Sequence, residues 1–325
     1  MEISYLRASS IGTFKDCSWK YFLDYSVGLA SPAGKKAQLG TICHHLLEIL
    51  AKAKKTGHDK LQDKYTNPEY LLKIIWDRNL RVNPQNFDFT KADFKFCKNC
   101  IDTVLKSRYN PLKANILAVE KQFEIDLNDK GFGNPPCKLR GTVDLITEED
   151  SETLHIVDYK SGECKDWITG QPKKLEDFEK DIQVLVYNLA LSVLYPQYKY
   201  RLFTIYYIRD GGPFTVSFGP ESIPKTINML RKYYKTILGE NNPKRLKDDA
   251  SRNGDKWKCK YVCHYGKTLN EKGVSLCDQY HYLRLKNDLA VAATKIQQLS
   301  VEGKPVELSR RNDYSRAKIA KASLK

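Results

Sequence analysis

The sequence contains no long hydrophobic run. No stretch reaches the roughly 18 to 20 apolar residues that span a membrane, and the most apolar one, 182–195, is interrupted by Gln183, Asn188 and Ser192. The first residues lack the basic and apolar segments of a secretory signal. No G-x-x-x-x-G-K-[ST] loop for nucleotide phosphates occurs either. These absences argue against a membrane protein and a built-in ATP motor, and they favour a cytoplasmic location.

A disulfide framework and an acidic surface are also lacking. Nine cysteines in 325 residues are an odd number in a long chain, which argues for a reducing compartment. Lysine and arginine outnumber the acids by 54 to 39, and the net charge of +15 suits a polyanionic partner such as DNA. Residues 244–267 interleave basic and aromatic side chains and predict a nucleic-acid surface, with an ordinary solvated face as the alternative.

Two short apolar runs in the middle of the chain each lead to an aspartate. Residues 139–145 contain Asp144, and residues 156–162 contain Asp158 followed by Lys160. Positions i and i+2 of a strand point to the same face, so Asp158 and Lys160 project together, and a neighbouring strand can bring Asp144 beside them. Two carboxylates and an ammonium can hold a divalent cation and orient water, which predicts phosphodiester hydrolysis. The alternative is a polar hairpin with solvated aspartates.

Further motifs lie on either side of these strands. Upstream, Gly40 and His44 open a helix with apolar periodicity, and downstream Gln183 and Tyr187 share one helical face at the spacing i, i+4. A lone histidine on a helix is usually a packed core residue, so His44 carries weight only together with the other motifs.

With these residues, the chain resembles the RecB-type branch of the PD-(D/E)XK nuclease superfamily over about residues 5–285. The family motifs G-x-x-x-H, G-x-x-D, D-x-K-[ST]-G and Q-x-x-x-Y fall on Gly40 and His44, Gly141 and Asp144, Asp158 to Gly162, and Gln183 and Tyr187. The resemblance implies an α/β fold with a restriction-endonuclease-like core, in which helices flank a central mixed sheet. A helical insertion and a C-terminal segment with cysteines complete this expected fold.

The resemblance also implies roles for the motif residues. It implies that Mg²⁺ or Mn²⁺ is held by His44, Asp144 and Asp158. Carboxylates suit Mg²⁺, and the histidine shifts the preference towards Mn²⁺. Lys160 is expected to orient the attacking water or stabilise the transition state, while Gln183 and Tyr187 position water or phosphate.

Four cysteines lie near the two ends of the chain: Cys17, Cys259, Cys263 and Cys277. In AddB-type and CRISPR-adaptation iron–sulfur exonucleases, one N-terminal and three C-terminal cysteines hold a [4Fe–4S] cluster, and the resemblance implies the same ligand set here. Ser18 stands where a proline is usual, and the gaps between the last three cysteines are wider than in the family. Zinc, with His264 as a further candidate ligand, and no metal at all are the alternatives. The remaining cysteines are interpreted as core, loop or incidental residues: Cys43, Cys97, Cys100, Cys137 and Cys164.

One nuclease domain is expected over residues 1–300. It comprises a helical insertion at about 38–112, a sheet core at about 115–218 and a cysteine segment at about 255–280, followed by a basic, flexible tail at 301–325. The predicted strands are 115–127, 138–147, 153–159, 200–209 and 214–218, and helices are predicted at 5–26, 176–194, 222–238 and from 278 onward.

The sequence therefore predicts a metal-dependent DNA nuclease, an exonuclease of recombination, repair or replication that acts on single-stranded DNA or single-stranded ends. Any unwinding would come from a separate helicase or recombination partner, and a cellular, phage or mobile-element origin is equally compatible. The alternative is a non-catalytic iron–sulfur or zinc module that binds DNA within a larger complex. The complete set of motif residues argues against that alternative.

Overall fold

The computed structural model describes residues 1–302 except 2, 4, 30, 33, 58–66, 82–87, 133–136, 166–169 and 210. The chain divides into two compact units. We call Ala33–Leu230 the sheet unit, and Met1–Pro32 together with Arg231–Lys325 the cysteine unit. The single domain expected over 1–300 stays a prediction, and the tail expected at 301–325 lies, from residue 303 onward, outside the described residues.

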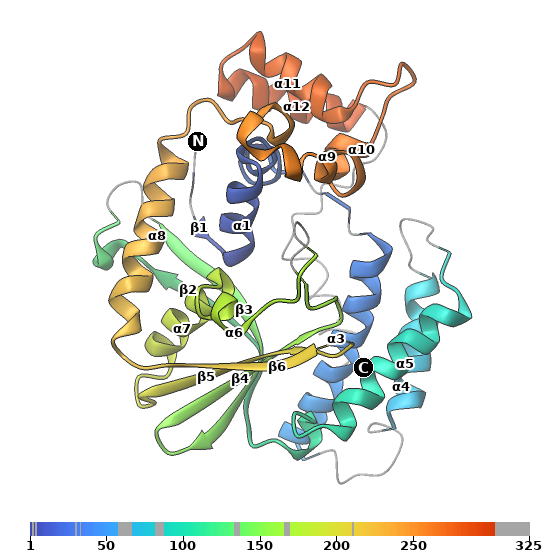
Figure 1. The fold of residues 1–325 in the computed structure, drawn as a ribbon, viewed down its shortest axis with the longest axis vertical. Helices are drawn as coiled ribbons and strands as arrows, with labels where there is room; N and C mark the ends of the chain where they lie inside the picture. The colour runs from blue at the N-terminus through green and yellow to red at the C-terminus, as the bar shows by residue number, and fades with distance from the viewer. Residues whose placement is uncertain are drawn as a thin grey trace. The chain divides into compact units, whose positions relative to one another are not determined.

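The sheet unit is built on a mixed sheet (Figure 1). Its strands are β2 (Ile116–Asp126), β3 (Lys138–Asp150), β4 (Thr153–Lys160), β5 (Tyr200–Tyr207) and β6 (Gly211–Phe218). Each strand pairs with the next one: β2 with β3, β3 with β4 and β5 with β6 are antiparallel, whereas β4 and β5 are parallel. A parallel pair needs a crossover connection, and α6 (Leu175–Glu179) and α7 (Ile182–Leu194) provide it between β4 and β5. The predicted mixed sheet is confirmed, and all five predicted strands are found.

Three helices form a group in the sheet unit (Figure 1): α3 (Lys35–Lys55), α4 (Pro68–Arg81) and α5 (Lys91–Lys106). They share one hydrophobic core with the sheet, in which Leu46 of α3 and Ile101 of α5 lie with Leu145 of β3 and Val157 of β4. The helical insertion expected at about 38–112 therefore consists of helices that cover one face of the sheet.

The helix predicted at 176–194 is two helices, α6 (Leu175–Glu179) and α7 (Ile182–Leu194). The carboxylate of Asp181 accepts hydrogen bonds from the backbone N–H groups of Gln183 and Val184, at 2.7 and 3.4 Å. A side chain that satisfies these N–H groups begins a new helix, so the single-helix prediction was wrong at this point. The prediction for α8 (Ser222–Leu238) is confirmed at both ends.

The cysteine unit is assembled from two stretches that are far apart in the sequence. Besides the end of α8, its described elements are β1 (Tyr5–Leu6), α1 (Ala8–Asp16), α2 (Ser18–Tyr21), α9 (Trp257–Tyr261), α10 (His264–Lys267), α11 (Leu276–Leu285) and α12 (Leu289–Glu302), with a π-helical turn at Phe22–Ser26. Short 3₁₀ turns lie at Leu246–Asp248 and Ala250–Asp255 in this unit, and at Pro111–Lys113 and Asn128–Lys130 in the sheet unit. The core of the cysteine unit contains Trp19, Leu23, Tyr265, Tyr280 and Ile296.

Two helix boundaries in the cysteine unit differ from the prediction. The helix expected at 5–26 is interrupted at Cys17, whose backbone is extended and whose sulfur accepts a hydrogen bond from the Lys20 N–H at 3.4 Å. The helix expected from Asp278 begins at Leu276, because Ser275 caps it by accepting a hydrogen bond from the Asp278 N–H. None of the helices in the described residues combines the length and apolar character that crossing a bilayer requires.

Candidate active site and cysteine site

Asp144 and Asp158 lie where strands β3 and β4 separate. The last residues of these strands that pair are Leu145 and Val157. Leu145 directly follows Asp144 in β3, and Val157 directly precedes Asp158 in β4. Leu145 and Val157 lie in the core that the sheet shares with the helix group, and because side chains alternate along a strand, Asp144 and Asp158 are directed out of that core. The two carboxylates are close enough that the charge of Asp144 adds to burial in raising the pKa of Asp158. The predicted convergence of Asp144 with Asp158 is present in the structure.

A chain of hydrogen bonds starts from Lys160. Its Nζ lies 2.7 Å from Asp158 Oδ2 and donates to Gln183 Oε1 at 3.3 Å. Gln183 Nε2 donates to the Tyr187 hydroxyl at 3.0 Å, and that hydroxyl donates to the Thr142 carbonyl at 2.6 Å. The Q-x-x-x-Y motif of α7 therefore holds the lysine of β4 and is itself anchored on β3.

His44 reaches the same site from α3. Its Nδ1 lies 3.3 Å from Asp144 Oδ2. Helix α3 passes close to the end of β4 at Gly40, where an added Cβ atom would lie 2.8 Å from Ser161 Oγ and the serine hydroxyl would have to rotate.

The electrostatics of the site separate the two carboxylates. Burial raises the pKa of Asp144, but the hydrogen bond and charge of His44 and the charge of Lys160 outweigh burial and hold this pKa below its usual range. At Asp158, whose side chain is only 11% exposed, burial dominates and raises the pKa. Burial disfavours the charge of Lys160, yet Asp158 and Asp144 raise its pKa. Pairs of groups with diverging pKa values are typical of catalytic sites.

The donors of this site fit a hard divalent cation. One imidazole and two carboxylates are the ligand types that Mg²⁺ and Mn²⁺ accept. In the part of the chain that the structure describes, no three His, Cys, Asp or Glu side chains converge as a finished coordination shell. Here His44 and Asp144 contact each other while Asp158 contacts Lys160, so a cation would replace the His44–Asp144 contact.

The four predicted cysteines line one cavity of about 350 Å³ in the cysteine unit. The cavity is also lined by basic side chains, those of Lys20, Arg245, Lys247, Lys256 and Lys260. Backbone N–H groups point to two of the sulfurs, from Lys20 and Leu246 to Cys17 and from Lys247 to Cys259. Burial raises the pKa of Cys17 and Cys259, and it raises the pKa of Cys277 to about 12.

Close packing brings two of these cysteines together. A Cβ atom on Gly266 of α10 would lie 2.0 Å from the backbone oxygen of Cys259 in α9. Only glycine allows α9 and α10 to approach this closely, so Gly266 sets the relative position of Cys259 and Cys263. The β-bridge between Leu269 and Ser275 folds the chain back before Cys277, which accommodates the wide gap in the sequence.

Comparison with known proteins gives the family. The sequence pattern of the PD-(D/E)XK nuclease superfamily matches residues 6–267. The chain belongs to this superfamily. Its relatives include large helicase/nuclease proteins: an ATP-dependent helicase/deoxyribonuclease subunit of Streptococcus agalactiae is 24% identical over 172 residues, or 49% of this chain.

The corresponding protein of Streptococcus uberis is 24% identical over 168 residues, and that of Lactococcus lactis is 23% identical over 161. This PD-(D/E)XK chain spans only 14 to 15% of the length of these relatives. A crystal structure of a candidate exonuclease from Eubacterium rectale has the same fold, with a TM-score of 0.50 at 14% identity. The match covers 85% of this chain and 92% of the other.

The basic segment of this PD-(D/E)XK chain is partly occupied with internal contacts. Lys258 is 20% exposed and pairs with Asp16 and Asp255 at 3.5 and 3.6 Å. Lys260 lies over the ring of Tyr261, which is 65% exposed. A nucleic-acid surface at 244–267 stays a prediction, and Tyr261 with Lys260 is the part of it that is best exposed for base stacking.

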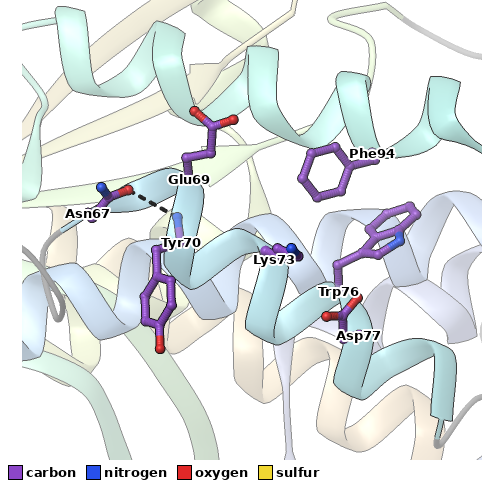
Figure 2. Close-up of a pocket in the computed structure, with 7 residues that line it drawn as sticks. All are labelled: Asn67, Glu69, Tyr70, Lys73, Trp76, Asp77 and Phe94. Carbon is purple, nitrogen blue, oxygen red and sulfur yellow. Dashed lines mark hydrogen bonds between the residues drawn. The ribbon is translucent and has the colours of Figure 1, made fainter.

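A separate hollow of about 620 Å³ lies along α4 and α5 (Figure 2). Its lining includes the edge-on pair of Trp76 and Phe94, whose ring centroids are 5.3 Å apart. None of the residues predicted for catalysis or metal binding lines this hollow. The candidate active site of this chain is therefore the site where β3 and β4 separate, at Asp144 and Asp158.

Two features of the structure were not anticipated from the sequence. The carbonyl of Thr142 anchors Tyr187, and nothing in a sequence marks a backbone acceptor. The thiols of Cys100 and Cys97 raise the pKa of Cys43, and all three are buried in the core that α3 and α5 share, so the C-x-x-C interpreted as incidental belongs to a group of neighbouring thiols.

Proposed function

We propose that this chain is a divalent-metal-dependent deoxyribonuclease, an exonuclease acting on single-stranded DNA or single-stranded ends. The observation that supports this most is the continuous contact from Asp158 through Lys160 and Gln183 to Tyr187, with Asp144 and His44 beside it. It combines an acidic cation site with a fixed ammonium group, which is what phosphodiester hydrolysis requires.

In this proposal, His44, Asp144 and Asp158 hold the cation. When bound, Mg²⁺ or Mn²⁺ would polarise the phosphodiester and lower the pKa of a water molecule. The ammonium of Lys160 has three N–H donors, and contacts to Asp158 and Gln183 account for two of them. The third donor is left to orient the attacking water or to bind a phosphate oxygen.

Gln183 and Tyr187 position the lysine rather than react. The Gln183 carbonyl oxygen accepts from Lys160, and its amide donates to Tyr187, so the amide cannot rotate without breaking both bonds. Burial raises the pKa of Tyr187, and the charges of Asp158 and Asp144 raise it further, so the hydroxyl keeps its proton for the Thr142 carbonyl. The fixed side chains hold Lys160 in one orientation before substrate binds.

DNA as the substrate is supported by the net charge of +15 and by the relatives named as helicase/deoxyribonuclease subunits. Exonuclease activity is supported by the name of the structural neighbour. The relatives also support a separate helicase as a partner, because the chain has no nucleotide-phosphate loop of its own.

We further propose that Cys17, Cys259, Cys263 and Cys277 bind a [4Fe–4S] cluster. A tetrahedral zinc site, with Zn–S bonds of about 2.3 Å, would need all four sulfurs drawn together around one ion. In a four-iron cluster each thiolate binds a different iron, which suits sulfurs spread around a cavity of about 350 Å³. The basic lining would balance the negative charge of such a cluster.

The nuclease proposal is tested with end-labelled single- and double-stranded DNA in Mg²⁺, Mn²⁺ or EDTA. The wild type should cut in both metals and not in EDTA, whereas Asp158→Ala and Lys160→Ala should bind DNA without cutting it. Glu152→Gln, at an exposed site in the same hairpin, is the matched control and should cut normally. Near-normal cutting by Asp158→Ala would refute the assignment, and DNA binding without cutting by every protein would favour a non-catalytic DNA-binding module.

The cluster proposal is tested by anaerobic purification, visible absorbance and metal analysis. About four iron atoms per chain are expected in the wild type, with strong loss in Cys17→Ser. Cys97→Ser removes a cysteine from the other unit and should keep the iron. One zinc per chain and no visible absorbance would replace the cluster by a zinc site.

A further inference from the structure

A third carboxylate lies in line with the two aspartates. Strands β2 and β3 pair Val119 with Leu145 and Lys121 with Val143, which places Glu120 opposite Asp144. On its other side, Asp144 lies opposite Asp158 when the β3–β4 register is continued by one residue beyond Leu145 and Val157. Residues opposite each other on neighbouring strands lie side by side. Glu120, Asp144 and Asp158 therefore form an acidic row across three strands, which we call the carboxylate row.

Glu120 has an unfavourable backbone conformation. Its φ is +50°, and among the described residues it is the only non-glycine residue with a positive φ. A glutamate is disfavoured there, whereas glycine adopts the conformation freely. Residues held in such a conformation are typical of functional sites.

The charge of Glu120 also reaches the hydrogen-bonded residues of the site. Together with the charges of Asp158 and Asp144, it adds to the burial that raises the pKa of Tyr187. The Tyr187 hydroxyl is bonded to Gln183, which holds Lys160. The charge of Glu120 is thus close enough to act on a residue of the site, in agreement with the strand register.

We propose that Glu120 is a positioning residue of the active site, whose negative charge beside Asp144 strengthens binding of the divalent cation without being one of its ligands. This inference rests on the proposed function and extends it to a residue outside the four family motifs. Carboxylates that support metal ligands from outside typically change metal affinity or activity by about 10- to 100-fold when they are removed.

The direct test is calorimetric titration of the protein with Mn²⁺ alone, which needs no cleavage. Glu120→Gln removes the charge and should weaken Mn²⁺ binding about 10- to 100-fold, while kcat at saturating Mn²⁺ stays within a few-fold of the wild type. Glu120→Asp keeps the charge and should restore most of the affinity. Glu124→Gln is the matched control on the same strand: its carboxylate is exposed, pairs with Lys138 and Arg140, and should not affect Mn²⁺ binding.

A second variant separates this role from a structural one. Glu120→Gly relieves the unfavourable φ, so it should raise the thermal unfolding midpoint while weakening Mn²⁺ binding as much as Glu120→Gln does. Wild-type Mn²⁺ affinity in both variants would overturn the inference, whatever their stability.

Failure of the inference and failure of the proposed function give different results. If the wild type binds Mn²⁺ and cuts DNA but Glu120→Gln behaves identically, only the role of Glu120 is wrong. If the wild type neither binds Mn²⁺ nor cuts DNA, the metal-dependent nuclease itself is refuted, and the role of Glu120 with it.

Discussion

Gly141→Ala should disturb the active site through a single aromatic ring. Gly141 of β3 pairs with Phe123 of β2, and an added Cβ would lie 2.4 Å from Phe123 Cζ and 2.7 Å from Cε1. Ordinary contact begins at 3.4 Å, so the ring would have to withdraw by about 1 Å. Phe123 is only 6% exposed and meets Tyr187 edge-on, with the ring centroids 6.2 Å apart.

The magnitude follows from this overpacking. Extra methyl groups in a well-packed interior typically cost about 1 to 3 kcal/mol, so the thermal midpoint should fall by several degrees. DNA cleavage should fall as well, because displacement of Phe123 shifts Tyr187 and loosens its bond to Gln183. Thermal unfolding and cleavage of end-labelled DNA measure the two effects separately.

A second substitution tests the cause. Phe123→Leu replaces the ring by a smaller side chain and makes room for the added methyl group. The double variant with Gly141→Ala should therefore be more stable than the sum of the single changes implies, by about 0.5 to 3 kcal/mol. Gly12→Ala is the control: its Cβ meets nothing within 4 Å in helix α1, so it should be neutral or stabilising by about 0.5 to 1 kcal/mol. Strict additivity of the two changes, or normal stability and cleavage in Gly141→Ala, would refute the steric argument.

Three further changes test other parts of the chain. Gly266→Ala should lower the metal content of purified protein, because its methyl group would collide with the Cys259 backbone; unchanged metal would contradict this. Asn188→Ala should cost about 1.5 to 3 kcal/mol in urea denaturation, since it removes the acceptor 2.5 Å from the buried Arg201 guanidinium, and a loss below about 0.5 kcal/mol would count against it. Partial burial raises the pKa of Glu48, but its partners outweigh burial and lower this pKa to about 2. The stabilisation that ionised Glu48 contributes is therefore complete above the usual pKa of 4.5 and disappears as the pH falls towards 2. The difference in thermal midpoint between wild type and Glu48→Gln should therefore shrink over that window, and a difference that is constant with pH would disprove it.

Periodicity was enough to predict the regular elements. The strand ending in Asp158 and Lys160 is continuous and apolar, and alternation alone places both side chains on one face. Helix α8 has a strong apolar stripe and was predicted to the residue. The sequence could not predict the break at Cys17, where the chain stays extended and the sulfur caps the next helix.

The candidate site was predictable only in its motif residues. The types and order of His44, Asp144, Asp158 and Lys160 carry the family resemblance, and the structure brings these side chains together. The unusual backbone of Glu120 could not be predicted, because a positive φ at a glutamate is imposed by the surrounding sheet. Register across three strands is a tertiary property, and local sequence does not specify it.

The discontinuity of the cysteine unit has a consequence for biogenesis. Its first stretch, Met1–Pro32, leaves the ribosome before the whole sheet unit, and its second stretch begins only at Arg231. Domains generally fold as units while synthesis proceeds, so the sheet unit can fold before Tyr280 and Ile296 have been synthesised. Trp19 and Leu23 share a core with these two residues and therefore lack their packing partners until then. The nascent chain must keep this N-terminal stretch accessible until residues near the C-terminal end emerge, and Cys17 meets Cys277 only at that late stage.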